Sequence, residues 1–267
     1  MRVVALDADV IVFVSDVWQT TCTAVRAGDE GFVIDSPVYP DELDALPGVL
    51  EQAAFPVSGL LATHADWDHL LGRLAFPEAS LGCGESTAER LAAEPGAAQR
   101  ELKRFDEGQY VDDRRPLALG GIQPLPVPGR LSLGSSEGSP ERELELYPAD
   151  GHTADGTAYL IPWLGTLVCG DYLSPVEIPW ISPDGSLDAY EATLERLRPI
   201  VERAETVVPG HGRPLQRTEA LTLLEEDLAY LRALRDAGVD APLPAGRRTE
   251  TQRLIHVSNA EHAKRVH

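Results

Sequence analysis

The chain has 267 residues, a length that fits one large domain or two small ones and is ample for a sizeable hydrophobic core. Hydrophobic residues make up 43% and charged residues 25%, which excludes disordered, collagen-like and coiled-coil chains. The 43 Asp and Glu residues outnumber the 23 Lys and Arg residues. The resulting net charge of −20 argues against nucleic acid as a partner, because the average surface would repel a phosphate backbone.

Neither a membrane segment nor a disulfide framework is predicted. The longest apolar stretch near the start, residues 10–14, is far too short to span a bilayer and is flanked by aspartates. We therefore expect a soluble, cytoplasmic protein with no membrane partner. Cys22, Cys83 and Cys169 are widely spaced and form no CxxC pair, so we expect small buried residues and no thiolate zinc site.

In chain order, the first half begins with short β-branched runs and continues with helical patterns. A β-meander, a helix, a buried strand and a helical segment are predicted over residues 1–36, 41–54, 57–64 and 86–105. Pro95 and Gly96 are expected to divide the last segment into two helices. Residues 117–140 are rich in Gly, Pro and Ser and predict a loop with at most an edge strand.

The second half repeats this order of elements. Three strands, a helix, a strand and a final helix are predicted over residues 142–152, 156–163, 165–173, 186–204, 205–212 and 221–234. The leucine stripe of the last helix is expected to face the core, with contact between copies in a homo-oligomer as the alternative. The repeated order predicts two similar halves, for which a sheet-on-sheet core flanked by helices is the simplest arrangement.

Histidine is the most informative residue type, because four of the seven histidines fall in turns at predicted strand ends. The densest group follows the apolar run SGLLA, where His64, Asp66, Asp68 and His69 place four potential metal ligands within six residues. Such a turn can point its side chains at one centre, and imidazole suits zinc or iron whereas carboxylate suits harder ions. The alternative interpretation is a solvated acidic turn with a capping aspartate.

Three further candidate ligands, His152, Asp171 and His211, follow later predicted strands in the glycine-containing turns GHT, GD and GHG. Each alone fits a structural residue as well as it fits a ligand. Together with the first group they form the order HxDxDH, H, D, H, with spacings of 83, 19 and 40 residues after His69. The ordered set is far more specific than any of its parts.

These motifs resemble the metallo-β-lactamase fold superfamily of metallohydrolases, and the resemblance extends from the N-terminal meander to Gly212. It implies an α/β fold of the αββα sandwich type, with two mixed β-sheets packed face to face and the metals at one edge. The whole chain, residues 1–267, is then expected to form a single domain, with 213–267 as a C-terminal helical extension packed on it. The implied ligands are His64 and His152 for the first metal, Asp68, His69 and His211 for the second, and Asp171 as the bridge.

The sequence departs from the family pattern at Asp66, which stands where the pattern HxHxDH has its second histidine. If Asp66 binds metal, the site carries three carboxylates and acidifies a bound water less than a three-histidine site does. Two divalent ions are expected. Zinc is the first candidate, and the extra carboxylate makes iron or manganese the alternative. If Asp66 turns away, the first site is weak and the protein can run on one ion.

The resemblance implies hydrolysis of a small-molecule ester, lactone, thioester or phosphoester by a metal-bound hydroxide. Asp68 is expected to bind metal and orient the hydroxide. The bridging Asp171 fits a lactonase, thioesterase-like or phosphoesterase branch better than a true β-lactamase. The alternatives are an iron-dependent redox enzyme on the same scaffold, similar to flavodiiron oxygen reductases, and a non-catalytic metal-binding protein.

Residues around the substrate are less well defined by the sequence. Tyr172, beside Asp171, is the candidate for polarising or protonating a substrate oxygen, and Trp67 and Trp180 are candidates for lining a pocket. Residues 120–140 fit a lid or a passive surface loop. The locally basic tail after residue 246 either compensates the acidic body or anchors an anionic substrate, and His256 and Asn259 are candidates for facing the site.

Overall fold

The computed structural model describes residues 1–133 and 142–265 and contains two mixed β-sheets. The first sheet follows the chain order and consists of β1 (Arg2–Asp7), β2 (Val10–Val14), β3 (Thr21–Ala27), β4 (Glu30–Asp35), β5 (Gly59–Ala62), β6 (Leu81–Gly84) and β7 (Gln123–Leu125). The second consists, in spatial order, of β13 (Leu215–Gln216), β12 (Thr206–Val208), β11 (Thr166–Val168), β10 (Thr157–Ile161), β9 (Arg142–Pro148) and β8 (Gly129–Leu133).

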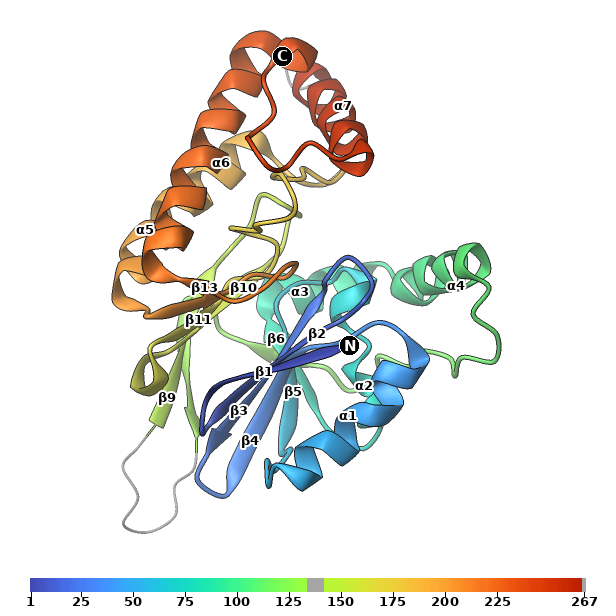
Figure 1. Ribbon diagram of the computed structural model, residues 1–267. Helices are drawn as coiled ribbons and strands as arrows, with labels where there is room; N and C mark the ends of the chain where they lie inside the picture. Colours follow the sequence, from blue (N-terminus) through green and yellow to red (C-terminus); the bar gives the residue numbers. More distant parts are fainter. Residues whose placement is uncertain (134–141, 266–267) are drawn as a thin grey trace.

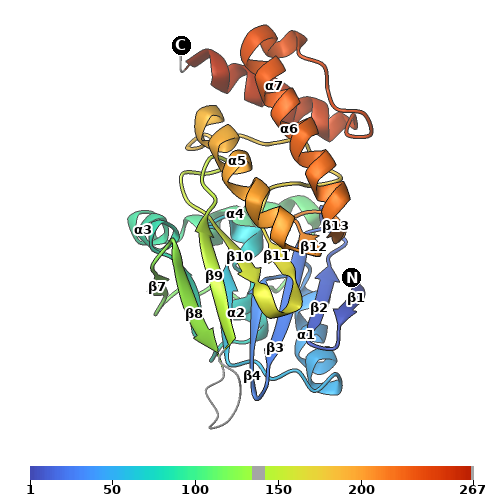
Figure 2. The same cartoon turned by 90° about the vertical axis from the view of Figure 1, so that its left-hand side faces the viewer.

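Helices cover the outer face of each sheet (Figures 1 and 2). The α-helices are α1 (Pro40–Gln52), α2 (Gly72–Ala75), α3 (Glu85–Ala93), α4 (Ala97–Gln109), α5 (Leu187–Arg203), α6 (Arg217–Ala237) and α7 (Glu250–Arg265). Three short 3-10 helices are η1 (Trp67–His69), η2 (Pro162–Leu164) and η3 (Gly238–Asp240). The predicted break at Pro95 and Gly96 is confirmed, because α3 ends and α4 begins on either side of it.

Three apolar layers confirm the predicted αββα sandwich. One lies between the two sheets and includes Val12 and Tyr159, both with no exposed surface. A second lies between the first sheet and α1, and a third between the second sheet and the helices α5 and α6. Leu224, Leu228 and Leu231 of α6 are buried in this third layer, as the leucine stripe predicts.

The region from residue 117 to 140 is more regular than expected. It contributes β7 to one edge of the first sheet and β8 to the edge of the second, whereas the composition predicts a loop with at most one edge strand. Both strands are edge strands, where missing ladder partners and prolines are tolerated. The last part of the proposed lid, residues 134–140, lies outside the described residues.

Strand direction brings the loops with the candidate ligands to one edge of the sandwich. Strands β4, β5 and β6 are parallel, as are β11 and β12, and β9 runs in the same direction because it and β11 are each antiparallel to β10. The carboxyl ends of these strands therefore lie together. Main-chain hydrogen bonds from Thr157 N to Thr63 O, 2.7 Å, and from Thr21 N to Gly210 O, 2.8 Å, connect the two sheets at this edge.

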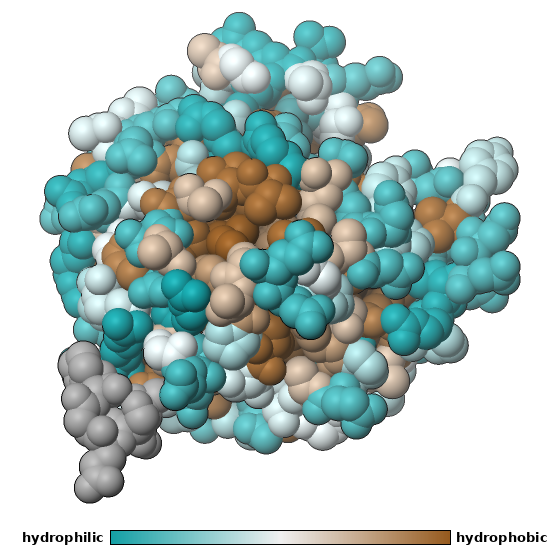
Figure 3. Space-filling model, turned by 60° about the horizontal axis from the view of Figure 1, so that its bottom comes forward, coloured by the Kyte–Doolittle hydropathy of each residue, from teal (hydrophilic) through white to brown (hydrophobic). Residues whose placement is uncertain are grey.

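The cysteines are small buried residues, as the sequence predicts. All three cysteines are free and buried. Within the described part of the chain, no helix combines the length and hydrophobicity needed to cross a membrane. Figure 3 views the molecule from nearer its lower side in Figure 1. On this face, hydrophobic residues lie near the centre and hydrophilic residues surround them. Homo-oligomer formation stays a prediction.

Candidate metal centre

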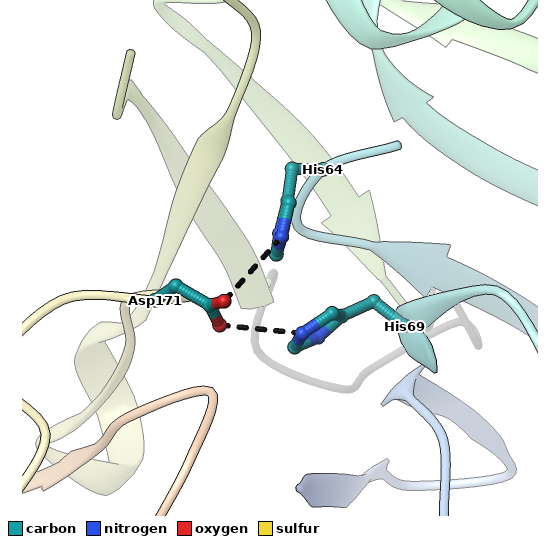
Figure 4. A group of neighbouring side chains, drawn as sticks. All are labelled: His64, His69 and Asp171. Carbon is teal, nitrogen blue, oxygen red and sulfur yellow. Dashed lines mark ion pairs between the residues drawn. The ribbon is translucent and has the colours of Figure 1, made fainter. Parts of the chain in front are cut away.

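The segment directly after β5 carries the first four candidate ligands. The strand is fully buried, and the chain then turns through Ala65 into η1, so that His64, Asp68 and His69 are buried at its end. The side chain of Asp155 fixes this turn by accepting a hydrogen bond from Ala65 N, 2.9 Å. In Figure 4, His64 and His69 point from this segment toward Asp171, which follows β11 in the other sheet.

The remaining ligands come from turns whose geometry requires glycine. His211 follows β12, and a Cβ atom at Gly210 would overlap the carboxylate of Asp171. Only glycine therefore allows these two loops to approach so closely. His152 follows β9 and is preceded by Gly151, whose φ of 121° strongly favours glycine.

Each of the four imidazole rings is held through its Nδ1 atom. This atom lies 3.0 Å from the carboxylate of Asp35 in His69 and 2.9 Å from the carbonyl oxygen of Trp180 in His152. In His64 it lies 3.0 Å from the hydroxyl of Thr63, and in His211 it lies 3.3 Å from the hydroxyl of Thr20. For His69 and His152 these acceptors fix the proton on Nδ1, which leaves the Nε2 lone pair free to bind a metal.

Three of the four Nε2 atoms lack a hydrogen bond within the described part of the chain. Those of His64, His69 and His152 are buried without a hydrogen-bond partner among the described residues, as is Oδ1 of Asp171. Buried polar atoms are normally paired, so this concentration of unpaired lone pairs in one place fits a metal centre. The donor set of imidazole and carboxylate suits zinc, iron or manganese.

The ligand atoms separate into two groups joined by Asp171. His64, Asp66 and His152 form one group and Asp68, His69 and His211 the other, with ligand atoms within 4.8 Å of one another in each. Oδ2 of Asp171 lies 3.3 Å from Nε2 of both His152 and His211, and its Oδ1 lies 3.2 Å from Nε2 of His69. The structure thus brings the candidate ligands together, with Asp171 between the two groups.

Asp66 faces the centre and does not turn away. Its Oδ2 lies 3.4 Å from Nε2 of His152 and 3.8 Å from Nε2 of His64, while its Oδ1 pairs with Arg90 at 3.0 Å. Arg90 of α3 also pairs with Asp155 at 2.8 Å. One oxygen of Asp66 is therefore available to a metal, and the other is neutralised by a guanidinium.

In the metal-free protein these groups stabilise one another as ions. Burial opposes protonation of His152, but Asp66 and Asp171 raise its pKa to about 9. Burial likewise opposes protonation of His211, and mainly Asp171 raises its pKa to about 10. Burial and the neighbouring His69 lower the pKa of His64. Metal ions would replace the protons that the imidazoles carry.

The structure corrects the prediction for Tyr172. Its hydroxyl is buried, donates a hydrogen bond to Asp150 O at 2.7 Å and accepts one from His152 N at 3.1 Å. Burial also raises the pKa of this phenol. Because its one proton is donated to Asp150 O, the hydroxyl is not available to polarise or protonate a substrate oxygen. Tyr172 instead fixes the main chain at His152.

Of the other residues proposed to line the substrate pocket or face the site, Trp180 lies at the metal centre and the others pack elsewhere. Trp180 lies beside the centre, with its ring 5.3 Å from that of His152, whereas Trp67 packs against Phe105 at 4.9 Å. His256 bonds to Tyr230 and to Val239 O, so it does not face the site. Asn259 bonds to the main chain at residues 179 and 181, behind the loop that carries Trp180.

The match to a known family agrees with this geometry. Residues 15–211 match the model of the metallo-beta-lactamase superfamily. The chain belongs to this superfamily. Superfamily membership and the clustered His and Asp residues support a metal-dependent hydrolase in general terms. No curated protein matches the sequence.

Solved structures share the fold of this superfamily member at low identity. A metallo-beta-lactamase family protein from Thermus thermophilus has a TM-score of 0.68 and 19% identity, covering 97% of this chain and 93% of that chain. A metallo-beta-lactamase from Pontibacter korlensis has a TM-score of 0.59 and 18% identity, over 84% and 98%. The sec-alkylsulfatase Pisa1 from Pseudomonas sp. has a TM-score of 0.69 and 12% identity, over 98% of this chain and 50% of that chain.

Sequence reasoning missed the residues that support the ligands. Asp35 ends β4 and holds His69, and a carboxylate at the end of a buried strand is a pattern that could have identified it. No sequence pattern identifies Arg90, because charged residues are common on the exposed face of a helix such as α3. Its partners Asp66 and Asp155 come from loops that only the folded chain brings together.

Proposed function

We propose that this protein is a hydrolase with two divalent metal ions that acts on a small ester, lactone, thioester or phosphoester. The observation that carries the proposal is the convergence of imidazole Nε2 atoms on Asp171, while each Nδ1 atom is held by the surrounding protein. This arrangement presents metal ligands in a fixed geometry, which is what a catalytic metal site needs. We further propose one domain, with residues 213–267 packed on it as an extension.

In this proposal His64, Asp66 and His152 hold the first ion, Asp68, His69 and His211 hold the second, and Asp171 bridges them. Bound divalent ions supply Lewis acidity, since they polarise the substrate oxygen and acidify a water molecule. Zinc is the expected metal because most of the candidate ligands are imidazoles. Manganese or iron is the alternative, because the carboxylate of Asp66 suits a harder ion.

Asp68 is the residue proposed to orient the attacking water and accept its proton. Its Oδ2 lies 3.6 Å from Nε2 of both His69 and His211, and the hydroxyl of Thr20 lies 3.5 Å away. The carboxylate therefore sits at the centre with one flank held by the protein. Substrate would approach beside Trp180, the exposed aromatic residue next to His152.

The test combines metal analysis with hydrolysis assays. Protein purified without added metal is analysed by plasma mass spectrometry, reloaded with zinc or manganese, and assayed on an ester, a lactone, a thioester and a phosphodiester. We expect about two ions per chain and turnover that disappears in Asp68→Ala, while Glu202→Gln on the exposed face of α5 behaves like wild type. Turnover that persists in Asp68→Ala, or no turnover on any panel member with either metal, would refute the proposal.

A second candidate, an iron-dependent redox enzyme, is favoured by the position of Asp66. A third carboxylate facing the centre makes the site harder and more suited to iron. Iron in the purified protein together with oxygen consumption in the presence of a reductant would support this alternative. A colourless zinc protein with hydrolytic activity would end it.

A further inference from the structure

The loop between β11 and α5 carries a carboxylate, that of Glu177, which no other group in the described structure binds. Glu177 is half-buried and lines a small pocket together with His152, Asp171 and Trp180. Within residues 1–133 and 142–265, no hydrogen bond or ion pair involves its side chain. By contrast, Asp66, Asp68 and Asp171 all lie within ion-pair distance of imidazoles.

Glu177 faces the metal centre without being one of its ligands. It belongs to none of the groups whose ligand atoms lie within 4.8 Å of one another. It nevertheless lies beside the centre, because it lines the same pocket as the candidate ligands His152 and Asp171.

An aromatic ring stands on the same side of the centre. Trp180 is three residues further along the loop, is 38% exposed, and lies with its ring 5.3 Å from that of His152. Trp180 and Glu177 line the same pocket, and an aromatic ring together with a carboxylate can bind an ammonium group, through the ring quadrupole and through charge. The two side chains therefore form a candidate cation subsite next to the proposed reacting centre.

Side chains of the C-terminal segment form hydrogen bonds with the main chain of this loop. Arg247 is almost fully buried, pairs with Asp227 at 2.5 Å, and donates hydrogen bonds to Glu177 O at 2.9 Å and Ser174 O at 3.3 Å. Gln252 and Asn259 accept hydrogen bonds from Ile178 N and Ile181 N, at 2.7 and 2.9 Å. The main chain is thus fixed on both sides of Glu177 while its side chain stays free to meet a ligand.

We propose that Glu177 is a specificity-determining residue that, together with Trp180, receives a positively charged group beside the scissile bond of the substrate. The inference rests on the proposed hydrolase function and narrows its substrate class to esters, lactones or thioesters that carry an ammonium group. An anionic substrate would instead meet the carboxylate of Glu177 at the pocket, where like charges repel.

The test uses two pairs of isosteric probes that differ in charge. Acetylcholine and its neutral analogue 3,3-dimethylbutyl acetate are compared as substrates, and choline and 3,3-dimethylbutanol are compared as ligands by calorimetry, all with zinc-loaded protein. The variants are Glu177→Gln and Glu177→Lys, with Glu202→Gln on the exposed surface of α5 as the matched control. Zinc content and circular dichroism confirm that each variant is folded and loaded.

We expect the kcat/KM ratio of the cationic to the neutral ester to fall about tenfold or more in Glu177→Gln and further in Glu177→Lys. Wild type and Glu202→Gln should retain both this ratio and the preference for choline. A ratio or a choline preference that is the same in wild type and Glu177→Gln would overturn the inference. If neither ester is hydrolysed while choline binding depends on Glu177, the cation subsite stands, and the panel of ester, lactone, thioester and phosphodiester with both metals decides the hydrolase proposal separately.

Discussion

Replacing Asp35 by Asn changes one atom of the side chain that orients His69. Asp35 accepts hydrogen bonds from Thr63 N at 2.8 Å and from the Thr63 hydroxyl at 2.9 Å, and its Oδ2 lies 3.0 Å from Nδ1 of His69. An asparagine that keeps the bond to Thr63 N presents its amide NH2 group to Nδ1. The imidazole proton must then move to Nε2, the atom that faces the metal, and block ligation.

The expected magnitude follows from the role of such outer partners in metal sites. Their loss lowers metal affinity by about 10- to 100-fold, which corresponds to about 1.4–2.8 kcal/mol. We expect a loss of this size for one of the two ions in Asp35→Asn, measured by zinc competition with a chromophoric chelator at fixed pH. Asp112→Asn, at an exposed position, is the control. Wild-type affinity for both ions in folded Asp35→Asn would refute the reasoning.

Four other changes test the centre and the core. Asp171→Ala should reduce bound metal to one ion per chain or less, because the bridge between the two groups is lost; two retained ions by plasma mass spectrometry would contradict this role. Asp66→His should fold and retain metal, because the family pattern has histidine there; an unfolded variant by circular dichroism would show that the pair with Arg90 is structural. Metal-free protein should become less stable in thermal melts as the pH rises from 6.5 toward 10. The pKa values of His152 and His211 are raised to about 9 and 10, so these two rings stabilise the fold only while they are protonated. Leu231→Ala should lower the free energy of unfolding in urea by about 2–5 kcal/mol, because this side chain has no exposed surface in the core beside α6; a smaller loss would mean that the core collapses around the cavity.

The sequence predicts the fold well and selects the candidate ligands because both depend on local patterns. Alternating and helical hydrophobic patterns determine the elements, and their repeated order determines the two halves. Candidate ligands such as His64 and His211 follow strands that pair in parallel within their own sheets. The packing of the two sheets against each other then brings their loops to one edge.

The parts that the sequence misses depend on partners far along the chain. Tyr172 looks available because its neighbour is a ligand, but the fold places its hydroxyl between Asp150 O and His152 N. The sequence offers two roles for the basic tail, and Arg247 of that tail is buried and paired with Asp227, 20 residues earlier. No periodicity or motif encodes such pairings, because they arise only when loops from distant segments meet.

The division of the ligands between the two sheets has a thermodynamic consequence. His64, Asp68 and His69 follow a strand of the first sheet, whereas His152 and Asp171 follow strands of the second. A bound ion would therefore act as a cross-link between the halves of the sandwich, and chelation would remove it without cutting the chain. At free metal 100-fold above its dissociation constant, such a cross-link stabilises the folded state by about 2.7 kcal/mol per ion. The surrounding metal supply would then set how long the folded chain persists.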